Sequence, residues 1–313
     1  MARDSDDPPR IAVVGSYNHD LSVTVPSIPV PGETVLGEDF EATPGGKGSN
    51  QAIAAARTGG DVAFIGAVGD DRFGEAARDL WKREDIDASG VRTTEPPTGV
   101  ALIHIAESGE NAIAVARGAN HELAADDVRT AALEASDVLL TQLETPVESV
   151  AAAVKAASDA GAEVILDPAP ARELPAEVLE ATDVVTPNES ELRILAGYDP
   201  DAEVKEEAVA HELLERGPSV VVVTLGDSGA LVVTDDRTAT IAPVPAEVVD
   251  TTGAGDAFNG AFGVARGEGE DVVTATEWGV TAGALACEER GVVPSLPERD
   301  ALDARRDAAG RSD

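Results

Sequence analysis

The stretch Asp250–Gly260 reads DTTGAGDAFNG: small residues with two glycines, then one acid, then the apolar spacing of a helix. We expect that helix to run from Ala257 to Val264. The glycines let successive N–H groups point outward and the helix adds its positive dipole end, so the stretch favours an anion. Because a carboxylate repels phosphate, Asp256 indicates group transfer, with a base that takes a hydroxyl proton beside amides that hold phosphoryl charge. The plainer interpretation is a glycine turn in which Asp256 is favoured by the dipole alone.

Two familiar phosphate-binding loops do not fit the chain. The dinucleotide pattern G-x-G-x-x-G would need glycine where Phe258 stands. A Walker loop would need Ser or Thr in place of Gly48 and glycine in place of Glu41. The anion-binding turn is therefore of another type.

A second glycine cluster, PGGKGSNQ, occupies Pro44–Gln51 and opens an alanine-rich helix expected from Gln51 to Arg57. Only four of the chain's 23 basic residues are lysines. Three of them, Lys82, Lys155 and Lys205, lie in polar helical stretches where we expect them to be solvated. Lys47 lies between glycines at a helix start, where the oxygens of a ligand would reach it. The alternative is that Lys47 is a loop residue without a binding role.

The charge of the chain excludes several classes of partner. There are 59 acidic and 23 basic residues among 313, a formal charge of −36 spread along the whole sequence. Such a surface repels nucleic acid and anionic membranes. With lysine so scarce, the composition is typical of a protein from a high-salt cytoplasm, where screening weakens self-repulsion; a generic acidic protein is the alternative.

Other classes are excluded by what the sequence lacks. The one cysteine, Cys287, allows no internal disulfide or metal-ligand spacing, and we expect it to be a small buried apolar residue. Neither a signal peptide nor an apolar run of membrane-spanning length is present. We expect a cytoplasmic protein with a single domain over residues 1–313.

Short apolar runs alternate with helical patterns along most of the chain. This alternation predicts an α/β fold with a mostly parallel central sheet and helices on both faces. Ligands of such sheets bind at the carboxyl ends of the strands. Two stretches, residues 21–43 and 98–117, alternate apolar and polar residues and predict short antiparallel strands. The expected strands are at 11–14, 62–67, 138–140, 164–166, 184–185 and 220–224, and the further helices at 72–83, 147–159, 175–179, 189–195 and 205–216.

These motifs, in this order, resemble the ribokinase-like (phosphofructokinase-B type) carbohydrate kinases over nearly the whole chain. The resemblance rests on the two glycine clusters together with GSYNHD at 15–20, TGVAL at 98–102, QLE at 142–144, DPAPA at 167–171, TPNESE at 186–191, TLG at 224–226 and GVVPS at 291–295. It implies that residues 21–43 and 98–117 form a small β lid that closes over a sugar and packs against the lid of a second subunit.

The resemblance implies roles for individual residues. Asp256 matches the catalytic base, with Gly253, Ala254 and Gly255 as the anion hole. Sugar hydroxyls would be held, in addition to Asp256, by Asn18, Asp20, Gly46, Lys47, Asn50 and Glu144. From the residues alone, Asn18 and Asp20 could equally form an Asx turn at the strand end.

The nucleotide would contact Asn188, Thr224, Gly226, Ser228 and Gly255. Asn188 and Glu191 would position Mg²⁺ mainly through water, although the same pair also fits a helix capping box. A monovalent cation, K⁺, would be held by Asp250, Thr252, Ala286, Glu289, Gly291 and Ser295.

The chain departs from the family near the sugar. His19 and His104 replace smaller or apolar residues, and Arg117 and His121 flank Gly118-Ala119-Asn120. Such residues would accept a second anionic group on the substrate, or they are only polar surface. The resemblance therefore implies ATP-dependent phosphorylation of the 5-hydroxyl of a pentose such as ribose. A ribose 1-phosphate kinase, a nucleoside kinase and a catalytically silent sugar-binding regulator are the alternatives.

Overall fold

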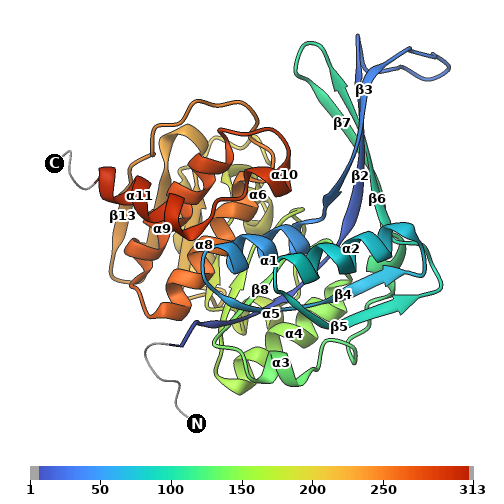
Figure 1. Ribbon diagram of the computed structural model, residues 1–313. Helices are drawn as coiled ribbons and strands as arrows, with labels where there is room; N and C mark the ends of the chain where they lie inside the picture. Colours follow the sequence, from blue (N-terminus) through green and yellow to red (C-terminus); the bar gives the residue numbers. More distant parts are fainter. Residues whose placement is uncertain (1–6, 310–313) are drawn as a thin grey trace.

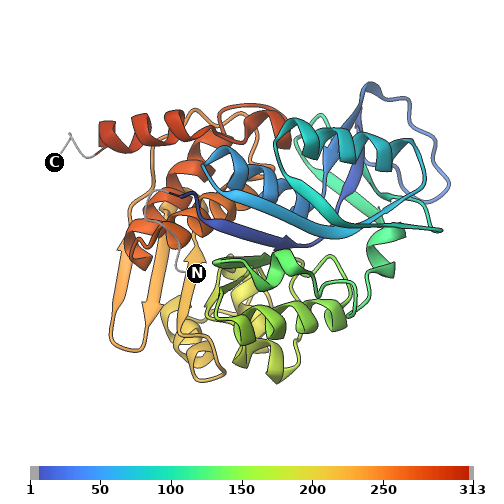
Figure 2. The ribbon, with the colours of Figure 1, turned by 60° about the horizontal axis from the view of Figure 1, so that its bottom comes forward.

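The protein is described by a computed structural model over residues 7–309, in which a large sheet lies between two layers of helices (Figures 1 and 2). Neighbouring strands from β11 to β5 are parallel, and β12 and β13 extend the sheet in antiparallel fashion. In sheet order the strands are β13 (Thr238–Ile241), β12 (Ala230–Thr234), β11 (Val220–Thr224), β10 (Val184–Val185), β9 (Glu163–Leu166), β8 (Val138–Thr141), β1 (Arg10–Val14), β4 (Asp61–Gly69) and β5 (Asp87–Thr94).

The central strands are continuous apolar runs because both faces of the sheet are covered. Along β1, Ile11 and Val13 pack into one hydrophobic cluster, and Ala12 and Val14 pack into the other. The first cluster lies under α1 (Lys47–Arg57), α2 (Arg72–Arg83), α8 (Ala254–Glu268), α9 (Val272–Ala286) and α11 (Arg299–Ala309). The second lies under α3 (Ala131–Glu134), α4 (Val147–Ala160), α5 (Ala176–Glu180), α6 (Glu189–Ala196) and α7 (Glu206–Leu214).

A separate small sheet stands beside the large one (Figure 1). Its order is β3 (Glu38–Gly45), β2 (Asn18–Val25), β6 (Gly99–Ala106) and β7 (Asn111–Ala116). The outer pairs are antiparallel, as the sequence predicts, but β2 and β6 run parallel. The sheet therefore joins two antiparallel pairs through a parallel seam, because both central strands leave the large sheet in the same direction.

The predicted fold class is confirmed, and several element bounds differ from prediction. Helix α8 begins at Ala254 rather than at Ala257, and α1 begins at Lys47 rather than at Gln51. Strands β5, β12 and β13 and helices α3, α10 (Val292–Ser295) and α11 were not predicted. Among residues 7–309, none of the helices has the length and apolar character needed to cross a membrane.

Candidate active site

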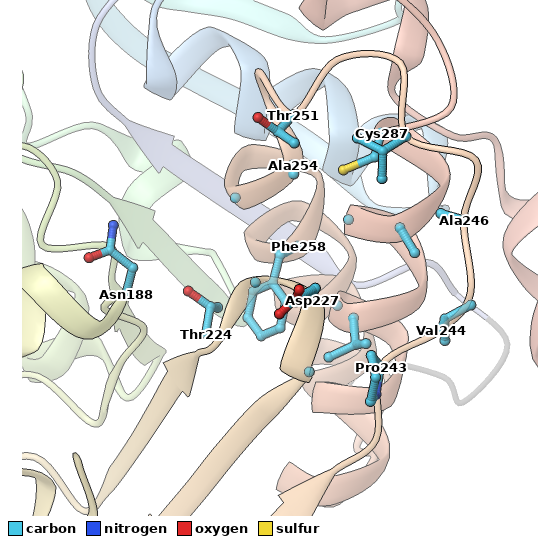
Figure 3. Close-up of a pocket in the computed structure, with 18 of the residues that line it drawn as sticks. Asn188, Thr224, Asp227, Pro243, Val244, Ala246, Thr251, Ala254, Phe258 and Cys287 are labelled. Carbon is cyan, nitrogen blue, oxygen red and sulfur yellow. The ribbon is translucent and has the colours of Figure 1, made fainter. Parts of the chain in front are cut away.

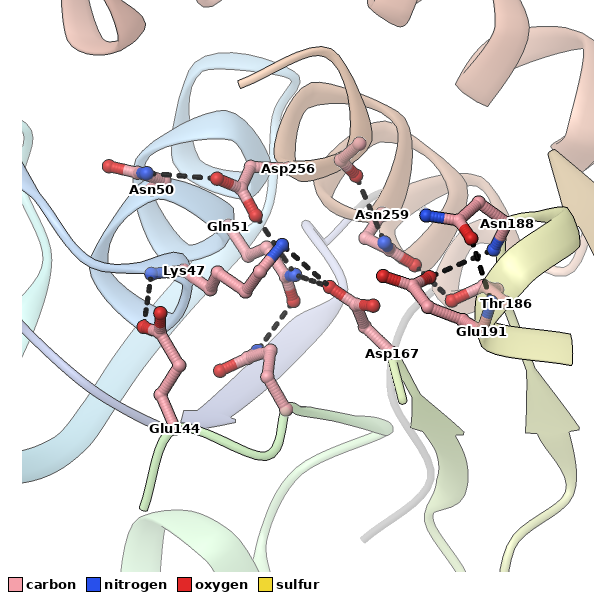
Figure 4. A network of polar contacts seen from close by, with 12 residues as sticks. Lys47, Asn50, Gln51, Glu144, Asp167, Thr186, Asn188, Glu191, Asp256 and Asn259 are labelled. Carbon is pink, nitrogen blue, oxygen red and sulfur yellow. Dashed lines mark hydrogen bonds and ion pairs between the residues drawn. The ribbon is translucent and has the colours of Figure 1, made fainter. Parts of the chain in front are cut away.

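The two glycine motifs meet at the carboxyl edge of the large sheet. Gly46, with φ of 90°, precedes α1, and Gly253, with φ of 84°, precedes α8, so both take a conformation that glycine adopts most easily. The helices approach closely because Gly260 lacks a side chain: a Cβ there would lie 2.4 Å from Ala54 Cβ. This packing brings their first turns together (Figure 4).

Asp256, in the first turn of α8, is 5% exposed and is held at both carboxylate oxygens. Asn50 Nδ2 donates to Oδ2 at 2.8 Å, and Gln51 Nε2 donates to Oδ1 at 3.2 Å. Burial raises the pKa of Asp256, while Lys47 and the two amide donors oppose that rise. The carboxyl group thus stays in one orientation in a weakly solvated place, as a proton acceptor requires.

Gln51 and Asp167 belong to the same network, although neither was predicted as a site residue. Gln51 Nε2 also donates to Asp167 Oδ2 at 2.8 Å, and Gln51 Oε1 accepts from Gln142 Nε2. Burial raises the pKa of Asp167 to about 7, despite the opposing effect of Lys47. The available signal was its position directly after β9, where a parallel sheet presents ligand-binding residues.

Lys47 is half-buried, and its Nζ lies 3.9 Å from Asp167 Oδ2. Burial lowers its pKa, but Asp167, Asp256, Glu144 and Glu191 together outweigh burial and raise it. The ammonium group therefore keeps its charge among four carboxylates. The other three lysines are exposed, as expected.

Asn18 and Asp20 lie on one face of β2, in the small sheet. Two glycines make room for them: a Cβ on Gly99 would lie 2.4 Å from Asn18 Oδ1, and one on Gly45 would lie 2.2 Å from Asp20 Oδ2. Burial raises the pKa of Asp20 to about 7, with further contributions from Glu144 and Asp256. This face of β2 is thus directed toward Asp256.

Glu144 completes the polar set opposite Lys47. Its Oε2 accepts a hydrogen bond from Ser16 Oγ and another from Lys47 N at 3.1 Å. The six residues predicted to hold sugar hydroxyls alongside Asp256 therefore lie on three structural units that converge: β2, the N-terminus of α1 and the segment that follows β8.

A pocket of about 550 Å³ opens on the other side of the α8 N-terminus (Figure 3). Four of the five predicted nucleotide residues line it, namely Asn188, Thr224, Gly226 and Gly255; Ser228 does not. Phe258 and small residues of α9 form its apolar wall. Cys287 also lines the pocket and is only half-buried, so its predicted role as a core residue was wrong: it follows the last residue of α9, at the edge of the core.

Asn188 and Glu191 form the capping box of α6. Asn188 Oδ1 accepts from Glu191 N at 2.9 Å, and Glu191 Oε2 accepts from Asn188 N at 2.9 Å. Among residues 7–309, Glu191 Oε1 accepts no hydrogen bond. Since Glu191 also influences the pKa values of Lys47 and Asp167, it lies between the pocket and the lysine network.

The segments predicted to bind a monovalent cation come together beside the α8 N-terminus. Asp250 Oδ1 accepts from the backbone and hydroxyl of Thr252 at 2.9 and 2.7 Å, and Oδ2 accepts from Gly291 N at 3.2 Å. Ser295 is buried nearby in α10, and Ala286 ends α9, whereas Glu289 is exposed. The structure thus joins the 250–252 turn to the segment after α9.

The histidines do not form a second anion site together. His19 points to the face of β2 opposite Asn18, where its ring stacks on Phe73 with centroids 4.1 Å apart. His104 is half-buried on β6, and Arg117 and His121 are exposed at the two sides of Asn120. Alternation along β2 therefore removes His19 from the predicted sugar side.

Residues 8–299 match the sequence model of the pfkB family carbohydrate kinases. The chain is 39% identical over 295 residues to a ribokinase from Haemophilus influenzae, covering 92% of this chain and 95% of that protein. A solved ribokinase from Thermotoga maritima superposes with a TM-score of 0.88 at 34% identity, covering 95% of this chain and 99% of the other. A ribokinase of Arabidopsis thaliana, solved with ribose and ATP, gives a TM-score of 0.88 at 30% identity and covers 96% and 98%.

Proposed function

This chain belongs to the pfkB family of carbohydrate kinases, and we propose that it is a ribokinase, which transfers the γ-phosphoryl group of ATP to the 5-hydroxyl of D-ribose. One observation carries the proposal: Asp256 stands at the α8 N-terminus between a polar cluster on one side and a large pocket on the other. The similarity to ribokinases over more than nine-tenths of the chain supports it. Since one family model matches residues 8–299, we treat the chain as a single kinase domain.

In this proposal the polar cluster holds the sugar. Asn18, Asp20, Asn50 and Glu144 supply acceptors and donors for several hydroxyl groups, each of which both donates and accepts. Asn50 Oδ1 is buried without a partner among the described residues, so a sugar hydroxyl would satisfy it. The adenosine part of ATP occupies the pocket beside Phe258, and its phosphates extend toward Gly255.

Transfer takes place at the N-terminus of α8. Asp256 accepts the proton of the 5-hydroxyl as the oxygen attacks the γ-phosphorus and the bond to the ADP oxygen breaks. The N–H groups of residues 253–256 face the charge that develops on the phosphoryl oxygens; that of Ala254 also donates to Thr251 O at 3.3 Å, and the other three have no acceptor among residues 7–309. Lys47 holds positive charge beside the transfer point. Positioning and charge stabilisation thus supply most of the rate enhancement.

Mg²⁺ fits the residues near Glu191. Glu191 Oε1, which accepts no hydrogen bond among residues 7–309, would supply an oxygen ligand of the kind that Mg²⁺ prefers. Asn188 Oδ1 already accepts from Glu191 N and Ser190 Oγ, so Asn188 would act through water. When bound, the ion neutralises charge on the β- and γ-phosphates.

A monovalent cation, K⁺, fits the turn beside the anion hole. We assign it to Asp250, Thr252, Gly291 and Ser295 together with the backbone of Ala286 and Glu289. Asp250 is the anchor, because hydrogen bonds from Thr252 and Gly291 outweigh burial and lower its pKa. A cation there would fix the turn that precedes Gly253.

The direct test is an assay for ribose 5-phosphate formation in high KCl with Mg²⁺ and ATP. Ribose should be consumed with stoichiometric release of ADP, and Asp256→Asn protein should serve as the inactive control. Turnover of nucleosides in preference to ribose would instead identify a nucleoside kinase. Ribose binding without ADP release would identify a catalytically silent sugar-binding protein.

A second candidate substrate, ribose 1-phosphate, is favoured by one observation. Burial lowers the pKa of Arg172, and the nearby positive charge of Arg117 lowers it further. Arg172 also donates a hydrogen bond to Leu143 O, next to Glu144. Two guanidinium groups thus gather near the sugar side of an acidic protein. Arg117→Ala should reduce kcat/KM for ribose 1-phosphate by roughly 10- to 100-fold and leave ribose unchanged if this candidate is correct. Equal losses for both substrates would assign Arg117 to the lid.

We also propose a cytoplasmic homodimer formed through the small sheet. Ile105, Ile113 and Val115 are 37%, 57% and 49% exposed. The strand register places them on the face that carries Asn18 and Asp20. A second copy of the small sheet would cover these side chains.

A further inference from the structure

Asn120 is a buried amide that directly contacts Asn18 but lies behind it. It belongs to the 3₁₀ turn Gly118–Glu122 and is 2% exposed. Its Oδ1 accepts from Tyr17 N at 3.0 Å, and its Nδ2 donates to Tyr17 O at 2.8 Å. The second N–H of Nδ2 donates to Asn18 Oδ1 at 2.9 Å.

These contacts determine the orientation of the side-chain amides of Asn120 and Asn18. A backbone N–H can only donate and a carbonyl can only accept, so the two Tyr17 groups fix the orientation of the Asn120 amide. Asn120 therefore presents an N–H to Asn18, and the atom of Asn18 that meets it must be the oxygen. Asn18 is left with its NH₂ group on the side away from Asn120. Among residues 7–309, no group accepts a hydrogen bond from Asn18 Nδ2.

The surroundings are built around this contact. Gly99 lies directly over it, because a Cβ on Gly99 would be 2.4 Å from both Asn120 Nδ2 and Asn18 Oδ1. Gly118, with φ of 49°, makes the turn that delivers Asn120, and a Cβ there would lie 2.2 Å from Pro97 O. Tyr17 itself is anchored, since its ring is fully buried and packs edge-on against Trp81 at 5.5 Å.

We propose that Asn120 is a positioning residue that locks Asn18 as a hydrogen-bond donor toward the sugar. This inference rests on the proposed ribokinase function. With Asp20 as an acceptor on the same face, the site presents one donor and one acceptor in fixed places. A substrate hydroxyl opposite Asn18 is then recognised as an acceptor, and a deoxy position there is rejected because the N–H group would be covered by the sugar and left unpaired.

The test is a double-mutant cycle with Asn18→Ala and Asn120→Ala, in which KM is measured separately for ribose and for ATP. Asn120→Ala should raise the KM for ribose about 10-fold, as expected for one lost hydrogen bond, and should change the KM for ATP less than about twofold. In the Asn18→Ala background the same substitution should change the KM for ribose less than about twofold. Equal factors in both backgrounds would overturn the proposal.

Asn120→Asp is the second variant, in case alanine prevents folding. Its carboxylate can still accept from Tyr17 N, but it cannot donate to Asn18, which would turn and present its oxygen to the sugar. The KM for ribose should rise only where Asn18 is present. Thr182→Val, which removes another buried polar group far from the site, should alter thermal stability without altering either KM.

A panel of monodeoxy riboses provides an independent readout. Asn18→Ala identifies the hydroxyl whose loss no longer matters, and Asn120→Ala should abolish discrimination at that same hydroxyl alone. Loss of discrimination at every position would mean that Asn120 only supports the loop. If the wild-type enzyme itself fails to phosphorylate ribose, the proposed function fails, whereas normal wild-type activity with an additive cycle overturns only the role of Asn120.

Discussion

Asn50 Nδ2 lies 2.8 Å from Asp256 Oδ2, a hydrogen bond that joins residues 206 positions apart in the sequence. It connects the first turn of α1 to the first turn of α8, so the two glycine motifs act as one site. Under the proposed reaction, the same amide both fixes the base and offers its buried oxygen to the sugar.

Replacing the base should stop turnover while leaving binding nearly intact. Asp256→Asn keeps the shape of the side chain but removes its proton-accepting charge, so kcat should fall by at least ~10²-fold. The KM for ribose should change little, because Asn18, Asp20 and Asn50 remain. Steady-state kinetics check this, and near-normal kcat in the variant would exclude Asp256 as the base.

The pH dependence of stability should report the buried carboxyl of Asp167. Its folded pKa of about 7 lies above the ordinary 3.8, so between these values the folded protein binds a proton that the unfolded chain has released. The proton on Asp167 therefore stabilises the folded protein at low pH, and this stabilisation is lost as the pH rises from about 3.8 to about 7. Asp167→Asn removes it, and the Tm of the variant relative to the wild type should be higher at pH 8 than at pH 5.

The melting curves must be taken at constant high salt. Asp159→Asn is the control for loss of one acidic charge, because Asp159 forms only an exposed pair with Lys155. A Tm difference for Asp167→Asn that is the same at both pH values would contradict the prediction.

Potassium should activate the enzyme specifically. Replacing K⁺ by tetramethylammonium at fixed ionic strength should lower kcat, because the larger cation cannot enter the turn between Asp250 and Gly291. In Asp250→Asn protein the two salts should give similar rates. Ionic strength must be fixed, since a chain of charge −36 depends on screening. Equal wild-type rates in both salts would remove the cation site.

The small sheet should carry the dimer interface on one face only. Ile113→Asp should convert the dimer to a monomer, because it places a charge in an apolar contact. Leu102→Asp is a matched control: Leu102 is 48% exposed and lies on the opposite face of β6. Sedimentation in high salt distinguishes them, and dissociation by both variants, or by neither, would contradict this choice of face.

Much of the large sheet followed from local patterns. Continuous apolar runs such as Val220–Thr224 predicted buried parallel strands, and α2 was predicted with its observed bounds. The parallel pairing of β2 with β6 was not predictable, because it depends on two strands that are distant in sequence. The β12–β13 hairpin was missed because its edge strand is short and partly exposed.

Within the candidate site, sequence indicated which residues gather but not how their amides point. Gln51, Asp167 and Asn120 take part through hydrogen bonds whose partners lie at least 100 positions away. His19 was misplaced because it lies between two predicted sugar-binding residues, Asn18 and Asp20, but packs on Phe73 at the opposite face of β2. In a strand, adjacent residues face opposite sides, and only the observed register tells which side meets the site.

The proposed sugar-binding residues are divided between the small sheet and the helices of the large one, and this division has a consequence for ATP hydrolysis. Asn18 and Asp20 belong to the small sheet, whereas Asn50 and Asp256 stand on helices that cover the large one. A ribose molecule that is hydrogen-bonded to both pairs would bridge the small sheet and the helices of the large one. Without ribose, the γ-phosphate would face Asp256 with only water as the phosphoryl acceptor, and no sugar would bridge the two pairs. If ribose is held by both pairs as proposed, we expect hydrolysis of ATP to be slow in its absence, because the site around the γ-phosphate is then incomplete.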